Sequence, residues 1–409
     1  MHPFYRLEPV LQRYDWGSTT ALQGVLGLPV DGRPVAEMWM GAHPRSPSTV
    51  RGWDEPRGAP GEALDALIRE HPEEVLGRRA VETYGPRLPF LLKVLAAEKA
   101  LSLQVHPHPH RARAGFNREN RAGLPLDAPE RSFKDDQHKP EMVVAVTRFE
   151  GLSGFRRPRR VLELLDGLPG DLVGQMRDAL LARPTKAGLR TAFALAVRAR
   201  TDPEVATDLA LTIEALRRRL EDGSPSPRAD ATVVLLAEQH PGDPGAVTAL
   251  LLNRVTLEPG ESMFVPAGHV HAYLSGCGME IMASSDNVLR AGLTGKFVDV
   301  EALLDCATFT PGPAARPAIS PLASALAVYR APIQEFAMVF GRVSDDDAGG
   351  AVALPASGPR IVVVGEGSVR LESASGVADL VRGDCVLVPD VAGPVTVRGQ
   401  GLAAVGYLP

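Results

Sequence analysis

The sequence has few cysteines and no long apolar run. Cys277, Cys306 and Cys385 are scattered and form no CxxC pair, so a disulfide framework is not expected. The longest apolar stretch, residues 88–97, is interrupted by Lys93 and is far shorter than the ~20 residues that a membrane span needs. The first residues also lack the apolar region of a secretory signal. We therefore expect a cytoplasmic protein with no membrane partner.

An excess of positive charge is missing as well. The formal net charge is −5 and the sequence pI is about 6.1, which argues against a nucleic-acid partner because such proteins carry a basic stripe. Walker A and G-x-S-x-G motifs do not occur, so nucleotide hydrolysis and serine-hydrolase chemistry have no support. Glycine and proline are abundant, at 40 and 36 residues. Without a G-X-Y period, this composition favours many turns and short strands over disorder.

The periodicity of apolar residues divides the chain into zones. Residues 1–155 read as strands and turns with one short helical patch at 62–76. In residues 158–240, Leu209, Ile213 and Leu216 form part of the stripe of an amphipathic helix, and we expect four to six helices there. Strands return after residue 244, and we expect them at 250–257, 263–265, 361–364, 369–371, 385–388 and 395–397.

One internal repeat bears on the fold class. Residues 257–266 align with 380–389 at an offset of 123, and both copies share Leu, Gly, an acidic residue, Val and Pro. Such a turn, strand and proline stop is typical of a jelly-roll or cupin barrel, although a ten-residue match can also arise by chance. Only the first copy is followed by histidines, His269 and His271; the second has Ala392 and Pro394 instead.

We therefore predict a mainly β protein with two cupin-type (jelly-roll) β-barrel domains, of which the first is catalytic, and an α-helical insertion. The predicted boundaries are 1–155 for the first part of the catalytic barrel, 156–243 for the inserted helical domain, 244–312 for the second part of the catalytic barrel, and 313–409 for a C-terminal cupin-like domain without metal ligands.

Histidines gather near residues 106, 138 and 270. Gln104 and His106 are two residues apart in a predicted strand and so point to the same face, and His269 and His271 do the same if that segment is extended. Glu141 lies at the entrance of the apolar strand 142–146. An amide oxygen, two imidazoles and a carboxylate would suit Zn²⁺. The alternative for any one histidine is a structural or surface role.

Three segments make the pattern recognisable: 104–107 (QVHP), 136–142 (DQHKPEM) and 265–273 (VPAGHVHAY). Together they resemble the type I mannose-6-phosphate isomerase (phosphomannose isomerase) family of the cupin superfamily. Residues 14–18, 36–44 and 284–297 add further matches, in the same order along the chain. Gly295 departs from the pattern, since the family commonly has proline there.

The resemblance implies a fold, a metal and a set of site residues. It implies one Zn²⁺ held by Gln104, His106, Glu141 and His271, with His269 a neighbour of the site. It also implies catalytic roles for Arg290, Glu280, Lys139 and Asp286, contacts of Ser102, Lys296 and Arg290 with the substrate phosphate, and a sugar pocket that includes Trp16 and His138. Core packing is an equal alternative for Trp16.

The implied reaction interconverts D-mannose 6-phosphate and D-fructose 6-phosphate by proton transfer between C1 and C2 through a cis-enediol. Glu280, in an apolar run, is the favoured proton carrier, with Asp286 and Lys139 as competitors and a structural carboxylate as the alternative. A metal-dependent cupin oxygenase and a non-catalytic sugar-phosphate-binding cupin are the other function classes; Gln104 argues against the first and Arg290 against the second. We expect a monomer, because no coiled coil or self-complementary patch is evident.

Overall fold

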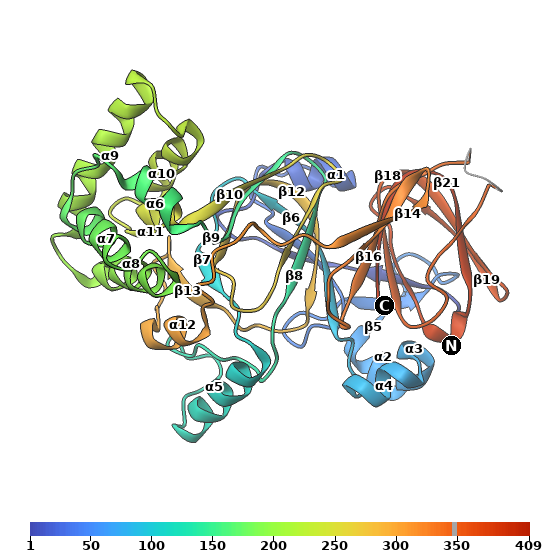
Figure 1. Ribbon diagram of the computed structural model, residues 1–409. Coiled ribbons are helices and arrows are strands. Elements are labelled where there is room, and N and C mark those ends of the chain that lie inside the picture. Colours follow the sequence, from blue (N-terminus) through green and yellow to red (C-terminus); the bar gives the residue numbers. More distant parts are fainter. Residues whose placement is uncertain (346–349) are drawn as a thin grey trace.

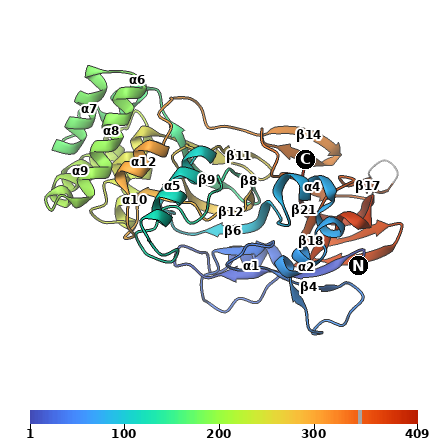
Figure 2. The same cartoon turned by 90° about the horizontal axis from the view of Figure 1, so that it is seen from below.

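The computed structural model describes residues 1–345 and 350–409. Two large antiparallel sheets lie beside each other, with a group of helices at the far end of the first sheet and both chain termini at the second (Figure 1). The view from below in Figure 2 shows the same order from helices to first sheet to second sheet. In the part of the chain that the structure describes, no helix is long and apolar enough to cross a membrane.

The first sheet has ten strands, with the hydrogen-bonded order β10-β9-β12-β6-β3-β2 and further strands paired to β8 and β7. Its strands are β2 (Val10–Gln12), β3 (Glu37–Met40), β6 (Phe90–Ala97), β7 (Leu103–Val105), β8 (Glu141–Ala145), β9 (Phe149–Phe155), β10 (Leu252–Leu257), β11 (Ser262–Val265), β12 (His271–Ala283) and β13 (Leu289–Gly292). Most of their residues are buried, and apolar side chains of β6, β8, β11 and β12 form the core of this sheet.

Strand β12 connects the two halves of this sheet. Its first residue, His271, pairs with β7 and β9, whereas its later residues pair with β6 and β8. The strand changes direction near Gly276, which has φ of 113°. A Cβ there would lie 2.5 Å from the carbonyl oxygen of Arg148, so only glycine fits. The bend brings the two ends of one strand to the same interior.

The helical block predicted for residues 158–240 contains five α-helices: α6 (Pro158–Leu165), α7 (Asp171–Ala182), α8 (Lys186–Arg198), α9 (Val205–Asp222) and α10 (Pro227–Gln239). The predicted stripe of α9 is buried at Leu209, Ile213 and Leu216. Phe193 of α8 contacts Phe155 of β9 edge to face, with ring centroids 5.6 Å apart. The block therefore shares one apolar core with the first sheet.

Shorter helices fill the remaining connections: α1 (Ala21–Leu26), α2 (Leu64–Glu70), α3 (Pro72–Leu76), α4 (Arg78–Tyr84), α5 (Pro109–Arg121), α11 (Gly245–Thr248) and α12 (Val300–Cys306), with 3-10 turns at η1 (Ala199–Thr201), η2 (Ala249–Leu251) and η3 (Asp390–Ala392). The helical patch expected at 62–76 is divided into a two-residue strand, α2 and α3, because Pro72 starts a new helix after His71.

The second sheet has eleven strands and joins both ends of the chain. It contains β14 (Ala318–Ala323), β15 (Ala325–Arg330), β16 (Ala337–Val343), β17 (Val352–Ala353), β18 (Arg360–Ser373), β19 (Gly376–Val381), β20 (Cys385–Val388) and β21 (Val395–Tyr407), together with β1 (Tyr5–Glu8), β4 (Thr49–Gly52) and β5 (Glu62–Ala63). Strand β1 pairs with β20, with Tyr5 opposite Leu387. Hydrogen bonds of the second sheet therefore join residues of the predicted segment 1–155 to residues of the predicted segment 313–409.

Two expectations about the strands need correction. Segments 361–364 and 369–371 belong to one strand, β18, because Gly365 forms a bulge after Val364 and not a turn, and Gly367 is paired with Gly401. The described strands are mainly antiparallel, as predicted, but neither sheet closes into a cupin barrel. The second sheet ends at β14, where Pro321 lacks an N–H, and at the two-residue strand β5. Alternation of apolar and polar residues predicts individual strands, whereas closure of a barrel depends on pairing between segments that are distant in sequence.

Candidate active site

Three buried side chains meet inside the first sheet. His106 directly follows β7, Glu141 opens β8 and His271 opens β12. One ligand atom of each lies within 4.8 Å of the others, and each residue is at most 3% exposed. The imidazole centroids of the two histidines are 5.0 Å apart. The convergence of three strand ends thus forms a compact group of two imidazoles and one carboxylate.

Backbone carbonyls orient both imidazoles. Nδ1 of His106 donates to the Asn287 carbonyl oxygen at 2.6 Å, and Nδ1 of His271 donates to that of His269 at 3.1 Å. The Nε2 atoms, each an acceptor in this tautomer, lie 3.2 and 3.4 Å from the Glu141 oxygens. Both Nε2 atoms are buried without a hydrogen-bond partner. Two such lone pairs beside a carboxylate fit a divalent cation, and an imidazole held by a carbonyl is typical of a metal ligand.

Electrostatics favours the same protonation states. Burial lowers the pKa of His106 to about 4, so its imidazole is neutral at physiological pH. Burial opposes ionisation of Glu141, but Lys139, followed by His106, outweighs this effect and holds the pKa of Glu141 well below its ordinary value. The Lys139 Nζ lies 3.0 Å from Glu141 Oε1. The centre therefore offers an ionised carboxylate and the neutral imidazole of His106.

Gln104 lies beside this cluster on β7. It is directly opposite His271 of β12 on one side and opposite Arg290 of β13 on the other. Side chains opposite each other in an antiparallel pair have Cβ atoms roughly 5 Å apart and share a face. Gln104 therefore lies between His271 and Arg290.

Asn287 is a residue that the sequence analysis missed. Its carbonyl oxygen holds His106, and its side-chain amide donates to the backbone oxygens of Asp135 and Gln137 at 2.8 and 2.7 Å. It is completely buried. Asn287 therefore connects the orientation of His106 to the segment before β8 that carries Lys139.

A line of buried polar groups extends from Glu280 across β12, β6 and β3. The Nζ of Lys93 lies 3.2 Å from Glu280 Oε2 and 3.3 Å from Glu37 Oε1. The Tyr273 hydroxyl donates to Glu280 Oε1 at 2.8 Å, and Trp39 Nε1 donates to Glu37 Oε2 at 2.8 Å. Each member is at most 8% exposed, so every charge in the line depends on its neighbours for compensation.

The charges in this line shift each other's proton affinity. Burial raises the pKa of Glu280 above its ordinary value, and Lys93 opposes the increase. Burial alone would lower the pKa of Lys93, but Glu37 and Glu280 outweigh it and raise that pKa. Lys93 and Glu37 were absent from the predicted site. The signal that could have found them is the single lysine in the apolar run 88–97, because a buried charge needs a partner.

A cavity of about 760 Å³ is lined by Asp286, His43 and His138, and its lining includes none of the three cluster residues. Asp286 Oδ1 lies 3.5 Å from His43 Nε2 and 3.6 Å from Arg45 Nη1. His138 Nε2 bonds to Glu335 Oε1 at 2.7 Å. Burial lowers the pKa of His43 to about 4, although Asp286 opposes the decrease. The structure thus brings Asp286 and His138 to one cavity.

Arg290 lies opposite Gln104 on β13, and Lys296 follows β13 along the chain. Arg290 is half-buried and Lys296 is exposed, and no acidic side chain pairs with either in residues 1–345 and 350–409. Burial, followed by repulsion from Arg290 and Arg45, lowers the pKa of Lys296. Ser102 is half-buried directly before β7. These cations repel each other, so an anion bound between them would be stabilised.

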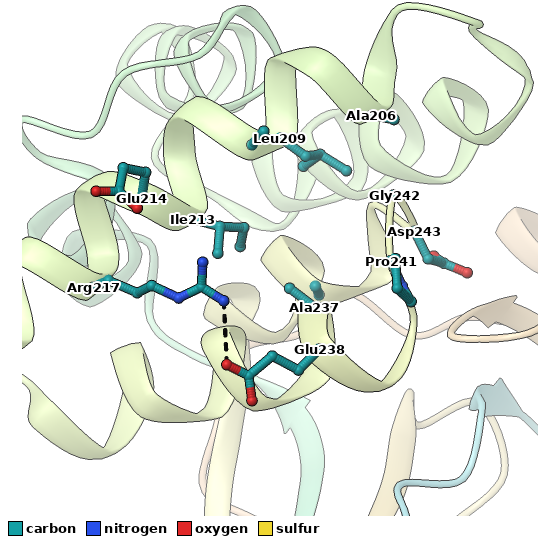
Figure 3. Close-up of a pocket in the computed structure, with 12 residues that line it drawn as sticks. Ala206, Leu209, Ile213, Glu214, Arg217, Ala237, Glu238, Pro241, Gly242 and Asp243 are labelled. Atoms are coloured by element: carbon teal, nitrogen blue, oxygen red, sulfur yellow. Dashed lines mark hydrogen bonds and ion pairs between the residues drawn. The ribbon is translucent and has the colours of Figure 1, made fainter.

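Two other predicted positions, Trp16 and His269, provide no ligand atom to the cluster. Trp16 stacks on Tyr14 with ring centroids 5.7 Å apart and packs against the core of the first sheet. His269 precedes β12 and lies outside any strand. The alternation with His271 that an extended segment would give is therefore not observed. A further cavity of about 650 Å³ lies between α9 and α10 in the helical block (Figure 3). Arg217 and Glu238 pair across it at 3.2 Å, and it contains none of the predicted site residues.

Comparison with known proteins identifies the family. Residues 4–158 match the model of the phosphomannose isomerase type I catalytic domain. The chain is 36% identical to mannose-6-phosphate isomerase of Escherichia coli (strain K12), over 97% of each chain, and 32% identical to that of Rattus norvegicus, over 98% of this chain and 93% of the relative. A crystal structure of mannose 6-phosphate isomerase from Salmonella typhimurium, bound to its substrate fructose 6-phosphate and to zinc, has a TM-score of 0.86, 32% identity and 99% coverage of both chains. The chain therefore belongs to the phosphomannose isomerase type I family.

Proposed function

We propose that this protein is a zinc-dependent isomerase that interconverts mannose 6-phosphate and fructose 6-phosphate. The observation that carries the proposal is the pair of buried, unpartnered Nε2 atoms of His106 and His271 beside the carboxylate of Glu141. Relatives that are similar along nearly the whole chain are mannose-6-phosphate isomerases, and one similar structure holds both fructose 6-phosphate and zinc. An oxygenase is not favoured, because nothing in these relatives points to oxygen chemistry.

His106, Glu141 and His271 would hold the zinc ion, with Gln104 as a fourth ligand. A bound zinc ion would act as a Lewis acid that polarises substrate oxygens. One carboxylate and three neutral groups leave a net charge near +1 on such a centre, so it would remain electrophilic. Lys139 adds positive charge next to Glu141, which further favours an anionic, enediolate-like substrate.

Arg290, Lys296 and Ser102 are proposed to bind the phosphate. The guanidinium of Arg290 can donate two parallel hydrogen bonds to phosphate oxygens, and the unpaired cation of Lys296 adds charge. Since Arg290 is opposite Gln104 in the β13–β7 pair, phosphate binding there would anchor one end of the sugar near the metal ligands.

Glu280 is proposed to carry the proton between C1 and C2. A useful base at neutral pH needs a pKa closer to 7 than that of a free carboxylate, and burial moves Glu280 in that direction. Lys93 and Tyr273 each occupy one of its oxygens, so the carboxylate is held in a fixed orientation. Asp286 and Lys139 are then assigned to opening of the sugar ring, with His138 and Trp16 in the sugar pocket.

Several finer points remain predictions. These are the domain boundaries at residues 155, 243 and 312, the assignment of the two open sheets to the cupin superfamily, the monomeric state and the cytoplasmic location.

Metal analysis followed by a coupled isomerase assay tests the proposal. The purified protein is expected to contain about one zinc ion per chain and to convert mannose 6-phosphate into fructose 6-phosphate. Chelation should abolish turnover, and added zinc should restore it. Iron with oxygen consumption, or sugar-phosphate binding without turnover, would contradict the proposal.

A further inference from the structure

The turn between Arg290 and Lys296 has an unusual backbone. Leu293 has φ of 54° and is the only non-glycine residue with positive φ in the described part of the chain. A leucine in this left-handed region is disfavoured and persists only where its surroundings impose it. Leu293 is 2% exposed and directly follows β13, which carries Arg290. The question is therefore what holds this turn.

Two side chains of the helical region hold it. Asp243 Oδ2 accepts a hydrogen bond from the Thr294 N–H at 3.2 Å, and Arg200 Nη2 donates to the Thr294 carbonyl oxygen at 2.6 Å. Asp243 and Arg200 also form an ion pair with each other, and their side chains are only 12% and 17% exposed. One ion pair therefore satisfies both backbone groups of a single residue in the turn.

The remaining contacts fix the pair and extend its effect to Lys296. Asp243 Oδ1 accepts from the Gly245 N–H at 2.8 Å, which ties the carboxylate to its own loop before α11. A Cβ on Gly245 would lie 2.8 Å from the Leu293 nitrogen, so the turn packs directly on this backbone. The hydroxyl of Thr294 in turn accepts from the Lys296 N–H at 3.1 Å. All three polar groups of Thr294 thus link Lys296 to the helical region.

We propose that Asp243 and Arg200 are positioning residues for phosphate recognition: they clamp the turn at Thr294 so that Lys296 faces the anion that Arg290 binds. This inference rests on the proposed function, because it assigns Lys296 to the substrate phosphate. It gives the helical region a task in the reaction, since Arg200 lies in η1 after α8 and Asp243 lies in the loop between α10 and α11.

The test compares Asp243→Asn and Arg200→Gln with wild type. Each variant is expected to raise KM for mannose 6-phosphate about 10-fold, the loss of roughly one charge-assisted contact, with kcat within about twofold and unchanged zinc content. The dissociation constant of inorganic phosphate, measured by calorimetry, should increase by the same factor. In a Lys296→Ala background, Asp243→Asn should have no further effect, because the clamp acts through Lys296.

The matched control is Arg217→Gln with Glu238→Gln, an exposed ion pair of the helical block that lines the cavity in Figure 3. This control should leave KM and phosphate affinity unchanged. If Asp243→Asn does not fold, Thr294→Val, which removes only the hydroxyl that holds Lys296, should produce the same rise in KM. An unchanged KM, or an equal loss in the presence and absence of Lys296, would overturn the inference. Phosphate affinity tests it even if wild type shows no isomerase turnover, which would refute only the proposed function.

Discussion

Tyr273 donates a hydrogen bond of 2.8 Å to Glu280, although both residues belong to the same strand, β12. A straight strand would separate residues seven positions apart by more than roughly 20 Å. The bend near Gly276 removes this separation and brings the two ends of β12 to one interior. Because His271 opens the same strand, a single strand provides a metal-ligand candidate and a carboxylate with an elevated pKa.

Replacing Glu280 by glutamine tests the proton carrier. The amide keeps the shape of the side chain but cannot accept a proton from carbon, so Glu280→Gln should lower turnover at least ~100-fold, the lower end of acid–base effects. The zinc content should not change, because Glu280 is outside the ligand set. Tyr273→Phe, which leaves the carboxylate in place, serves as the control and should have a smaller effect. Near-normal turnover of Glu280→Gln would remove this residue from the mechanism.

Loss of a metal ligand should separate metal binding from folding. His271→Ala removes one of the two unpartnered Nε2 atoms, and we expect zinc affinity to fall at least ~10-fold, since even changes around ligands cost that much. Zinc content after dialysis and the melting temperature with and without chelator are the measurements. His108→Gln is the matched control, because His108 contacts Thr308 and lies outside the cluster. Full zinc occupancy in His271→Ala would exclude it as a ligand.

A lysine at position 290 tests how the phosphate is bound. Lysine keeps the charge but loses the planar pair of donors, so Arg290→Lys should raise KM for mannose 6-phosphate about 10-fold or more. Inorganic phosphate should inhibit the variant correspondingly less. Arg254→Lys is the control, because Arg254 of β10 pairs with Glu150 of β9 at 2.9 Å and neither residue belongs to the cluster. Equal KM values for Arg290→Lys and wild type would place phosphate elsewhere.

Stability should fall below about pH 6.5. His43 has a pKa of about 4 in the folded protein, against about 6.5 when unfolded, so the unfolded chain binds the proton first as pH decreases. The contribution of neutral His43 is complete above about pH 6.5 and is lost progressively toward pH 4, by at most about 3 kcal/mol. Urea unfolding of wild type and His43→Asn between pH 4 and 8, with chelator present throughout, measures it. An identical pH dependence in both proteins would contradict the assignment.

The sequence predicted some parts of this site better than others. Gln104 and His106 lie two residues apart, and strand periodicity alone predicts that they share a face. Glu280 was singled out because a lone carboxylate in an apolar run must be either compensated or functional. Lys93 shows the same signal, but its partners could not be named, because they depend on the register of β6 with β3 and β12. That register is a property of the folded sheet and has no local signature.

In the fold too, local features could be predicted from the sequence, whereas long-range contacts could not. Helix α9 follows from its apolar stripe, and β20 has the predicted bounds, because both depend on neighbouring residues. Closure of the sheets and the assignment of β1 to the second sheet were not predictable in this way. They depend on contacts between segments that are almost a full chain length apart.

The pairing of Tyr5 with Leu387 has a consequence for synthesis of the protein. Strand β1 can pair with β4 soon after both have been translated, but its other edge remains open until β20 has also been translated. While the residues between β4 and β20 are being made, the nascent polypeptide therefore carries an unsatisfied strand edge. The second sheet can be completed only after β20 has been synthesised and reaches β1.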